Sequence, residues 1–426
     1  MILSKVLSIC NTFGNFAKSV EYMKQILLER QGYSERIERM FGKGMVVALT
    51  GQRRVGKSCV MKRIYDKYSQ DSLNNVIYID MEKTAFADIT NYKNLEAYVA
   101  ERLDTTKENY LFIDEVQEIQ DFEKAILSLQ SDESCQIMVT GSNAKMLSSE
   151  LSTRLRGRYM GYHIHGLDYA EFIEFHNLQD SDDSLSLFLQ YGGLPQLRQL
   201  GLENTDLVDD YLENVINTIV LRDIIERENI RNVPLLRTLV RFIADNIGKQ
   251  FSARSIVGFL KSQNTEASTN MVLNYLEYLC NAYIIDRIGR YNIHGKKLLE
   301  LGDSFYFEDL GLRNHLVGGN RHFDIEKVME NAVYRHLLRL GYTVYIGILH
   351  KAEIDFVAER QGSTVYIQVC YMLASEDTVE REFGNLRMIK DSHPKYVVSM
   401  DKMYGDTNVD GIRHLHLRDF LMRTSL

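Results

Sequence analysis

The sequence predicts an α/β protein whose N-terminal part holds a parallel sheet and whose later parts are helical, with a second and smaller α/β domain at the end. Two observations lead to this prediction. Short apolar runs alternate with helical segments up to about residue 160, and helical patterning then replaces them. A chain of 426 residues is also too long for one ordinary core, so several domains are expected.

Four runs in the first part have the length and composition of buried strands. Each is rich in β-branched or aromatic residues, and the segments between them are typical of helices. The runs are 45–49, 76–79, 110–113 and 136–140. Strands that alternate with helices in this way predict a parallel sheet.

The turn after the first run matches the pattern G-x-x-x-x-G-K-[ST], and it lies between a strand and a helix, as that pattern requires. Gly51 and Gly56 allow successive N–H groups to face a phosphate, and the helix that follows directs its positive end there. Lys57 is expected to bridge the β- and γ-phosphates, and Ser58 to ligate Mg2+. A chance glycine-rich turn is the alternative. We therefore expect ATP and Mg2+ as ligands, with the nucleotide contacted by Gly51, Gln52, Arg53, Arg54, Val55, Gly56, Lys57, Ser58 and Cys59.

The third run delivers two carboxylates, Asp114 and Glu115, at its C-terminal end. Ligands bind at this end of the strands in open α/β sheets. Asp114 is expected to hold the metal ion, and Glu115 is expected to act as the general base that activates the attacking water. A glutamate directly after the metal aspartate favours hydrolysis over transfer of the phosphoryl group to a substrate. An acidic pair on the surface is the alternative.

Two further groups are candidates for the γ-phosphate. Ser142 and Asn143 follow the fourth run, and either would act as a hydrogen-bonding sensor or merely cap the next helix. Arg154, Arg156 and Arg158 form a cluster just before the patterning changes. We expect Arg158 to be an arginine finger, acting in cis or from a neighbouring subunit, although such charge clusters are often solvated faces. The sequence leaves the oligomeric state open.

Taken together, the motifs resemble the archaeal-type AAA ATPases of bacteria and archaea that carry a C-terminal domain of unknown function. The resemblance extends from about Tyr22 to the C terminus. It rests on LTGQRRVGKS at 49–58, FIDEVQ at 112–117, VTGSN at 139–143, LRGRY at 155–159, YGGLP at 191–195, YFEDLGLR at 306–313 and AEIDFV at 352–357.

This resemblance implies five parts: a helical lead-in, a P-loop NTPase core of the additional-strand ATPase type, a helical lid, a winged helix, and a domain similar to PD-(D/E)XK restriction endonucleases. We place them at 1–44, 45–165, 166–232, 233–305 and 306–426. For the YGGLP segment we predict only a tight turn near the lid.

Three helical stretches and two strand-like runs between residues 235 and 301 have the order of a winged helix. Basic residues outnumber acidic ones over 249–297, which predicts an interface for double-stranded DNA. The stretch 268–281 would be the recognition helix, and 287–297 the wing over phosphates. Since many winged helices dock proteins, a protein partner is the alternative. The basic residues in this comparison are Lys249, Arg254, Lys261, Arg287, Arg290, Lys296 and Lys297, and the acidic residues are Glu266, Glu277 and Asp286.

The last domain is predicted to keep the nuclease-like fold without cutting DNA. Asp355 stands where such nucleases carry their aspartate, and Glu330 is an additional carboxylate. Gln368 and Cys370 replace the acidic residue and the lysine that would follow. A hard dication prefers carboxylate oxygen, and a thiol cannot replace an ammonium group. Whether Glu330, Glu353 and Asp355 hold a metal or only form polar contacts stays open.

Composition excludes several classes of protein. The net charge of -8 argues against a surface that binds nucleic acid indiscriminately. Five cysteines at wide spacings, without a C-x-x-C pair, suggest neither disulfides nor a zinc cluster. No apolar stretch approaches the roughly 20 residues that span a bilayer, so we expect a cytoplasmic protein without membrane contact.

The expected function is a Mg2+-dependent ATPase whose nucleotide state controls contact with DNA or a partner. The alternative is a nucleotide-gated signalling switch that does not bind DNA.

Overall fold

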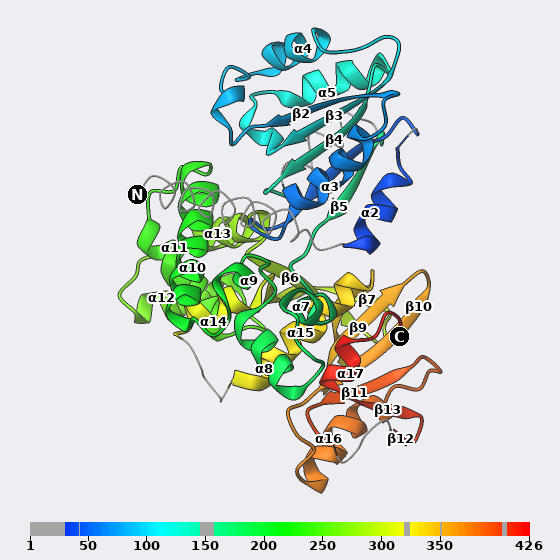
Figure 1. Cartoon of the computed structure of the whole chain (residues 1–426). Helices are drawn as coiled ribbons and strands as arrows, with labels where there is room; N and C mark the ends of the chain where they lie inside the picture. Colours follow the sequence, from blue (N-terminus) through cyan, green and yellow to red (C-terminus); the bar gives the residue numbers. More distant parts are fainter. Residues whose placement is uncertain (1–29, 42, 145–156, 319–323, 350–351, 403–406) are drawn as a thin grey trace, which may run out of the picture. The chain divides into compact units, whose positions relative to one another are not determined.

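The computed structural model describes residues 30–41, 43–144, 157–318, 324–349, 352–402 and 407–426 (Figure 1). These residues form two compact units. The first contains the described parts of Met1–Ala48, Lys57–Thr140 and Arg158–Tyr162. The second contains the described parts of Leu49–Gly56, Gly141–Gly157 and His163–Leu426.

A five-stranded sheet organises the first unit. Its strand order is β2-β3-β4-β1-β5, so β4 lies between β1 and β3. Parallel pairing joins β2 to β3 and β3 to β4. This is the P-loop NTPase fold with the additional strand, as predicted. The strands are β1 Val46–Thr50, β2 Asn74–Asp80, β3 Glu108–Asp114, β4 Gln136–Gly141 and β5 Tyr159–His163.

The four predicted runs correspond to β1 to β4, whereas β5 was not predicted. Strand β1 is buried along its whole length, which explains its uninterrupted apolar sequence. Strand β5 reads Tyr-Met-Gly-Tyr-His and buries only Tyr162. A strand with a glycine and a histidine at a sheet edge lacks the apolar run that marks a central strand.

Helices cover both faces of this sheet (Figure 1). Helices α2 (Gln31–Glu38) and α3 (Lys57–Ser69) lie on one face, and α4 (Tyr92–Ala100) and α5 (Phe122–Ser131) lie on the other. Helix α3 buries Val60, Met61 and Ile64, which share one side of the helix at spacings of three and four residues. Two 3-10 turns, η1 (Thr84–Phe86) and η2 (Val116–Glu118), complete the described part of the unit.

The second unit begins with helices. They are α7 Tyr169–His176, α8 Asp182–Tyr191, α9 Leu197–Leu200, α10 Thr205–Thr218 and the π-helical segment η4 Ile219–Glu226. The last three residues of the polar run 179–184 form the start of α8. Ser181 accepts a hydrogen bond from the Ser184 N–H and caps α8, and the acidic Asp182 and Asp183 occupy its first turn.

Three helices and a hairpin follow: α11 Val233–Asp245, α12 Ala253–Ser262, α13 Thr269–Asn281, β6 Ile285–Asn292 and β7 Lys297–Phe307. Ser252 and Ser268 cap α12 and α13. Strand β6 pairs antiparallel with β7 and parallel with β8, so the hairpin belongs to a larger sheet. The predicted domain limit at residue 305 therefore falls inside β7.

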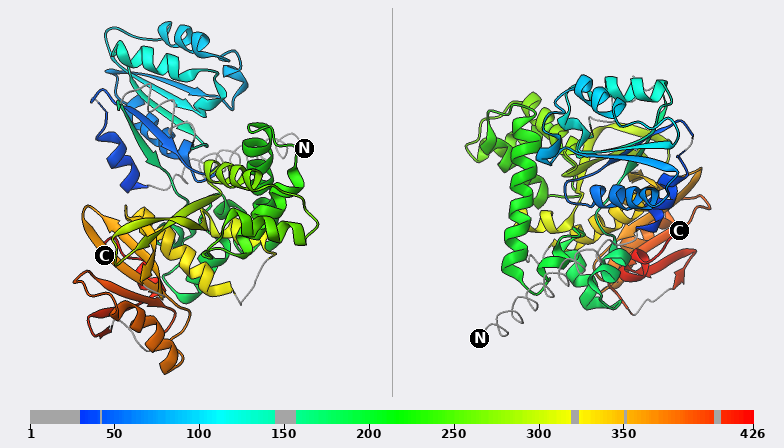
Figure 2. Two further views of the ribbon diagram at one scale, coloured as in Figure 1. Left: turned by 180° about the vertical axis from the view of Figure 1, so that it is seen from behind. Right: turned by 45° about the horizontal axis from the view of Figure 1, so that its top comes forward.

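That larger sheet has eight strands in the order β12-β13-β11-β10-β9-β8-β6-β7. It joins strands from the yellow-green part of the chain to strands from the orange and red part (Figure 2). A hydrophobic core lies between this sheet and α16, and it includes the fully buried Ile354, Val357, Phe383, Leu386 and Val397. The remaining elements are α14 Leu310–Leu316, α15 Ile325–Arg339, β8 Thr343–Leu349, β9 Ala352–Arg360, β10 Ser363–Val369, α16 Glu376–Arg387, β11 Lys395–Ser399, β12 Asn408–Val409, β13 Ile412–His416 and α17 Leu417–Leu421.

The four cysteines in the described part of the chain, Cys59, Cys135, Cys280 and Cys370, are free thiols. Cys10 lies outside the described residues. None of the described helices has the length and apolar character needed to cross a membrane.

Candidate nucleotide-binding site

The loop between β1 and α3 has the backbone that a phosphate-binding loop requires. Gly51, Arg54 and Gly56 have positive φ angles of 139°, 71° and 98°. A Cβ atom on Gly51 would lie 2.2 Å from the carbonyl oxygen of Ile164. Only glycine fits there, both for its φ angle and for this close approach.

The side chains of the loop point in different directions. Gln52 and Val55 are fully buried, whereas Arg54 is exposed. Arg53 is buried, and its Nε donates to Asp223 Oδ2 of η4 at 2.8 Å. A nucleotide contact by the Arg53 guanidinium, as predicted, would therefore have to compete with η4, which already holds this group.

Lys57 opens α3, and its Nζ lies 4.0 Å from Glu115 Oε1 at the end of β3. Both side chains are buried, with exposed fractions of 4% and 9%. The predicted phosphate-binding lysine and the predicted base are thus brought together. In a buried site the attraction between these charges is weakly screened, so they hold each other in place.

Asp114 is the centre of a hydrogen-bonded cluster. Thr140 Oγ1 donates to Asp114 Oδ1, and the Glu115 N–H donates to the same Thr140 oxygen at 2.9 Å. The Tyr78 hydroxyl donates to Asp114 Oδ2 at 3.4 Å. Burial raises the pKa of Asp114, although hydrogen bonds from Thr140 and Ser58 oppose that rise. The two residues predicted to hold the metal, Ser58 and Asp114, are therefore in contact.

Glu115 has a left-handed backbone, with φ 54° and ψ 53°. Such a conformation costs a glutamate on the order of 1 to 3 kcal/mol, and it is common where a side chain must be aimed into a site. The Thr140 hydroxyl fixes the Glu115 N–H, and Gln117 Nε2 donates to Glu115 Oε2. Thr140 and Gln117 were not predicted as site residues, although they belong to the VTGSN and FIDEVQ motifs.

The remaining predicted site residues are Asn143, Arg158 and Cys59. Asn143 is buried just after β4. Arg158 is exposed, and its carbonyl accepts from Gln130 Nε2 at 3.1 Å and from the Val46 N–H at 3.0 Å. Arg154 and Arg156 lie outside the described residues. The sensor role of Asn143, the arginine finger at Arg158 and the nucleotide contact at the exposed Cys59 stay predictions.

Residues 43–173 match the family model described as "AAA domain". This chain carries an AAA domain of the P-loop ATPase type. Residues 182–322 match a second model, described as "Domain of unknown function (DUF8612)". The predicted resemblance is thereby confirmed at the level of these two domains.

Similar proteins share most of the chain. An uncharacterized protein of Haemophilus influenzae is 29% identical over 408 residues, which cover 94% of this chain and 100% of that protein. Uncharacterized protein MJ1544 of Methanocaldococcus jannaschii is 28% identical over 392 residues, covering 87% and 86%. The Walker-type ATPase PABY2304 of Pyrococcus abyssi covers 69% of this chain and 96% of its own, with a TM-score of 0.50 and 15% identity. This last likeness supports the fold.

Beyond the AAA domain, the YGGLP and YFEDLGLR motifs interlock. A Cβ atom on Gly192 would lie 2.5 Å from the Gly311 nitrogen, and one on Gly311 would lie 2.0 Å from the Tyr191 carbonyl. The Gly193 N–H donates to Asp309 Oδ2 at 2.8 Å, and Asp309 Oδ1 accepts from Leu312 N–H and caps α14. The glycines of both motifs are therefore needed for close backbone packing, a role that the prediction of a tight turn did not include.

The predicted wing is less exposed than expected. Arg290 is buried, and its Nη2 bonds Glu353 Oε2 at 2.6 Å, so the prediction that it lies over phosphates is wrong. The inward position follows from β6 pairing with β8, which covers that strand. Arg287 lies 3.4 Å from Asp303. Lys296 and Lys297 remain exposed in the turn.

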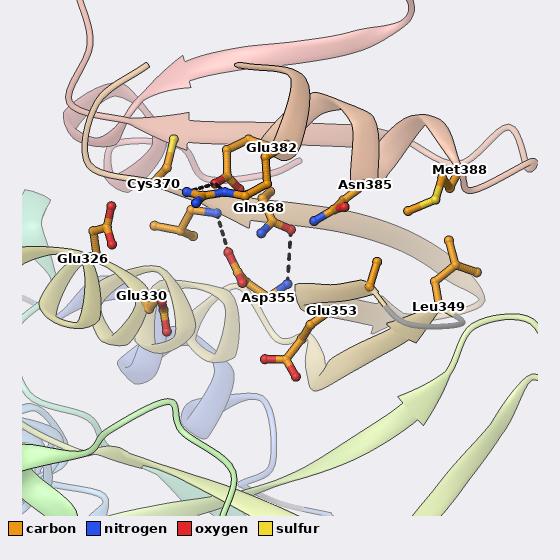
Figure 3. A pocket seen from close by; sticks show the side chains of 13 residues that line it. Glu326, Glu330, Leu349, Glu353, Asp355, Gln368, Cys370, Glu382, Asn385 and Met388 are labelled. Atoms are coloured by element: carbon orange, nitrogen blue, oxygen red, sulfur yellow. Dashed lines mark hydrogen bonds and ion pairs between the residues drawn. The ribbon is translucent and has the colours of Figure 1, made fainter. Parts of the chain in front are cut away.

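A second candidate site is an acidic pocket of about 800 Å³ in the C-terminal sheet (Figure 3). Asp355 Oδ2 accepts from the Val369 N–H at 2.7 Å, and Glu330 Oε2 accepts from the Tyr306 hydroxyl at 3.1 Å. Burial raises the pKa of Glu330 to about 7 and that of Asp355 well above its usual range. The charged lining residues are Glu326, Glu330, Glu353, Asp355, Arg381 and Glu382.

Gln368 lies beside Asp355, and Cys370 lines another part of the same pocket (Figure 3). One cation was not predicted: Arg381 of α16, whose Nε donates to Glu382 at 2.7 Å. Among the described residues, no three carboxylates of this pocket bring ligand atoms within 4.8 Å of one another.

Proposed function

We propose that this protein is a Mg2+-dependent ATPase that hydrolyses ATP at the site around Lys57. One observation carries the proposal: Lys57, Ser58, Asp114 and Glu115 are in contact at the N-terminus of α3 and the end of β3. Lysine, hydroxyl and carboxylate are the groups that phosphate and Mg2+ require at such a place.

The donor set fits magnesium. Ser58 and Asp114 offer hydroxyl and carboxylate oxygens, the hard ligands that Mg2+ prefers, and they already hydrogen-bond to one another. These two residues would hold the ion, which supplies positive charge to the phosphates when bound. A cation there would also favour the ionised form of Asp114, whose pKa burial raises.

Glu115 is the proposed general base. Its carboxylate faces Lys57 and accepts from Gln117. The phosphates of ATP would compete for the Lys57 ammonium, which would allow Glu115 to accept a proton from the attacking water. Gln117 and the Thr140 hydroxyl would keep the carboxylate aimed during this exchange. Asn143 and Arg158 would contact the γ-phosphate.

The loop also contacts the helical region through Arg53 and Asp223. We propose that this ion pair makes η4 sensitive to the nucleotide state, because a phosphate bound by the loop would attract the same guanidinium. Nucleotide binding would then alter the contact of the α11–β7 region with a partner.

Double-stranded DNA is one candidate partner, since Lys249, Arg254, Lys261, Lys296 and Lys297 are exposed. Phosphate contacts by such residues need no sequence readout. A protein partner is the second candidate, and one observation favours it. Helix α13, the predicted recognition helix, contains neither lysine nor arginine and exposes Glu277.

The deciding experiment measures the ATPase rate of the purified protein with and without double-stranded DNA over a range of salt concentrations. Hydrolysis that DNA stimulates, with a stimulation that falls as salt rises, supports DNA as the partner. Hydrolysis that DNA leaves unchanged supports the protein switch. An absence of hydrolysis above a Lys57→Ala blank would refute the ATPase proposal. Gel filtration with ATP and ADP, on the unaltered protein and Arg158→Ala, tests an arginine finger from a neighbouring subunit.

We do not propose nuclease activity for the acidic pocket. Plasmid and linear DNA with Mg2+ or Mn2+, with and without ATP, should remain uncut. Cleavage that disappears in Asp355→Ala would contradict this.

A further inference from the structure

Two histidines and a glutamate converge in the second unit. His163 ends β5, His165 follows two residues later, and Glu308 follows β7. The His163 Nε2 lies 3.4 Å from Glu308 Oε1, and the His165 Nδ1 lies 2.9 Å from the same oxygen. All three candidate ligand atoms lie within 4.8 Å of one another.

These separations are close to those in a tetrahedral metal centre. Bonds of roughly 2.0 to 2.2 Å to imidazole nitrogen and carboxylate oxygen place neighbouring ligand atoms about 3.3 Å apart. Glu308 is almost fully buried, whereas the side chain of His163 keeps an exposed fraction of 28%. A fourth position can therefore be reached by water. Imidazole ligands select zinc-like transition metals over Mg2+ or Ca2+.

The hydrogen bonding of His165 adds a second argument. Its Nδ1 contacts both Glu308 Oε1 and a guanidinium nitrogen of Arg335. In the tautomer with a proton on Nδ1, that proton and the Arg335 N–H point at each other and repel. In the tautomer without it, the lone pairs of Nδ1 and of Glu308 Oε1 face each other and repel. A cation between Nδ1 and Oε1 removes the repulsion between the two lone pairs, and Arg335 Nη2 then keeps Glu308 Oε2 as its acceptor.

Arg335 is compatible with such a cation. It also binds Glu308 Oε2 and Asp286, so it can remain on the far oxygen of the glutamate and orient the ligand carboxylate. The carboxylates of Glu308 and Asp286 carry two negative charges and Arg335 carries one positive charge, so the cluster keeps one negative charge.

We propose that His163, His165 and Glu308 bind one divalent transition-metal ion of the zinc type, with water as the fourth ligand. The ion has a structural consequence for the phosphate-binding loop. Ile164, between the two histidines, donates its N–H to the Thr50 carbonyl at 2.7 Å and places its own carbonyl against Gly51. Metal binding at both neighbours of Ile164 braces the start of that loop.

The test uses the full chain, stripped with a chelator and then titrated with Co2+ and Zn2+ without nucleotide. The unaltered protein should bind one equivalent of Co2+ with the visible absorption of a tetrahedral site, and Zn2+ should displace it. The double variant His163→Ala/His165→Ala should lose both signals. His294→Ala, in the exposed turn between β6 and β7, removes a histidine elsewhere and should retain them.

Thermal melting makes the test robust to misfolding. Zn2+ should raise the melting temperature of the unaltered protein and of His294→Ala, and it should leave a folded His163→Ala protein unchanged. Absence of a tetrahedral Co2+ spectrum in the unaltered protein would overturn the proposal. Equal metal binding by the double variant would also overturn it, and so would a Zn2+-induced rise in melting temperature that persists in His163→Ala.

Discussion

Arg53 of the phosphate-binding loop and Asp223 of the π-helical segment form a buried ion pair across 170 residues of sequence, with 2.8 Å between Nε and Oδ2. Their side chains are exposed by only 7% and 1%. Arg227 lies 3.8 Å from the other oxygen of Asp223. Because π-helical segments often occur at functional sites, this contact gives the nucleotide loop a direct connection to the helical region.

Asp223→Ala should destabilise the protein strongly. Breaking a buried pair by removing one partner costs about 3 to 5 kcal/mol, since the other charge stays buried. The free energy of unfolding in urea provides the measurement. As a control, Asp66→Ala removes an exposed partner of Lys62 at 3.4 Å, a pair worth at most about 1 kcal/mol. Equal losses in the two variants would show that the Arg53–Asp223 pair contributes little.

Lys57→Ala should reduce ATP affinity, because the loop loses its point charge. A charge-assisted hydrogen bond is worth roughly 1.5 to 3 kcal/mol, or about ten- to a hundredfold in the dissociation constant. Isothermal titration calorimetry with ATP measures this loss. Lys67→Ala, at the exposed end of the same helix α3, should bind ATP normally. A folded Lys57→Ala protein with unchanged affinity would remove Lys57 from the site.

Glu115→Gln should keep ATP bound and stall its hydrolysis. The amide cannot accept the proton of water, and general bases contribute about 10² to 10⁴ in rate. Affinity should be equal or higher, because the neutral side chain no longer competes for Lys57. Glu108→Gln, at the exposed start of the same strand β3, is the matched control. Turnover within a few-fold of the unaltered protein would exclude Glu115 as the base.

Changing Lys296 and Lys297 together to Gln should weaken DNA binding for all sequences and flatten its salt dependence. Each lost phosphate contact reduces the slope of log affinity against log salt by about 0.9. Fluorescence anisotropy at several salt concentrations measures both quantities. Lys62→Gln/Lys124→Gln makes the same charge change elsewhere and should have no effect. Undetectable DNA binding by the unaltered protein at low salt would favour a protein partner.

Glu330→Gln should stabilise the protein at alkaline pH. Burial raises the pKa of Glu330 to about 7 from its ordinary 4.5, so the folded state holds a proton that the unfolded state releases. This group therefore contributes stability below its unfolded pKa, and that stability is lost as pH rises through its folded pKa. Gln keeps an acceptor for the Tyr306 hydroxyl and does not ionise.

The expected result is a higher free energy of unfolding for Glu330→Gln at about pH 8 and little difference at about pH 4. The pKa of Asp355 is also raised, in part by Glu330, so its effect on the free energy of unfolding should have the same sign. The exposed Glu376→Gln should show no such pH dependence. A Glu330→Gln protein less stable than the unaltered one at alkaline pH would show that the charged form is preferred in the pocket.

Much of the nucleotide site could be predicted from contiguous residues. Gly51, Lys57 and Ser58 belong to one short segment, and Asp114 and Glu115 adjoin one apolar run. Their function depends on a local strand–turn–helix geometry and on burial of a parallel strand, both of which leave patterns in the sequence. The strand order that brings Lys57 to Glu115 follows from the resemblance to a known fold.

The sequence by itself thus determined the P-loop and the acidic pair at the end of β3. Only the tertiary structure decided that Arg53 pairs with Asp223, that Arg290 turns inward to Glu353, and that His163, His165 and Glu308 meet. The physical reason is the same in each case. A charged side chain shows no preference for burial in its local pattern, and its partner is set by which faces of distant elements come together in the fold.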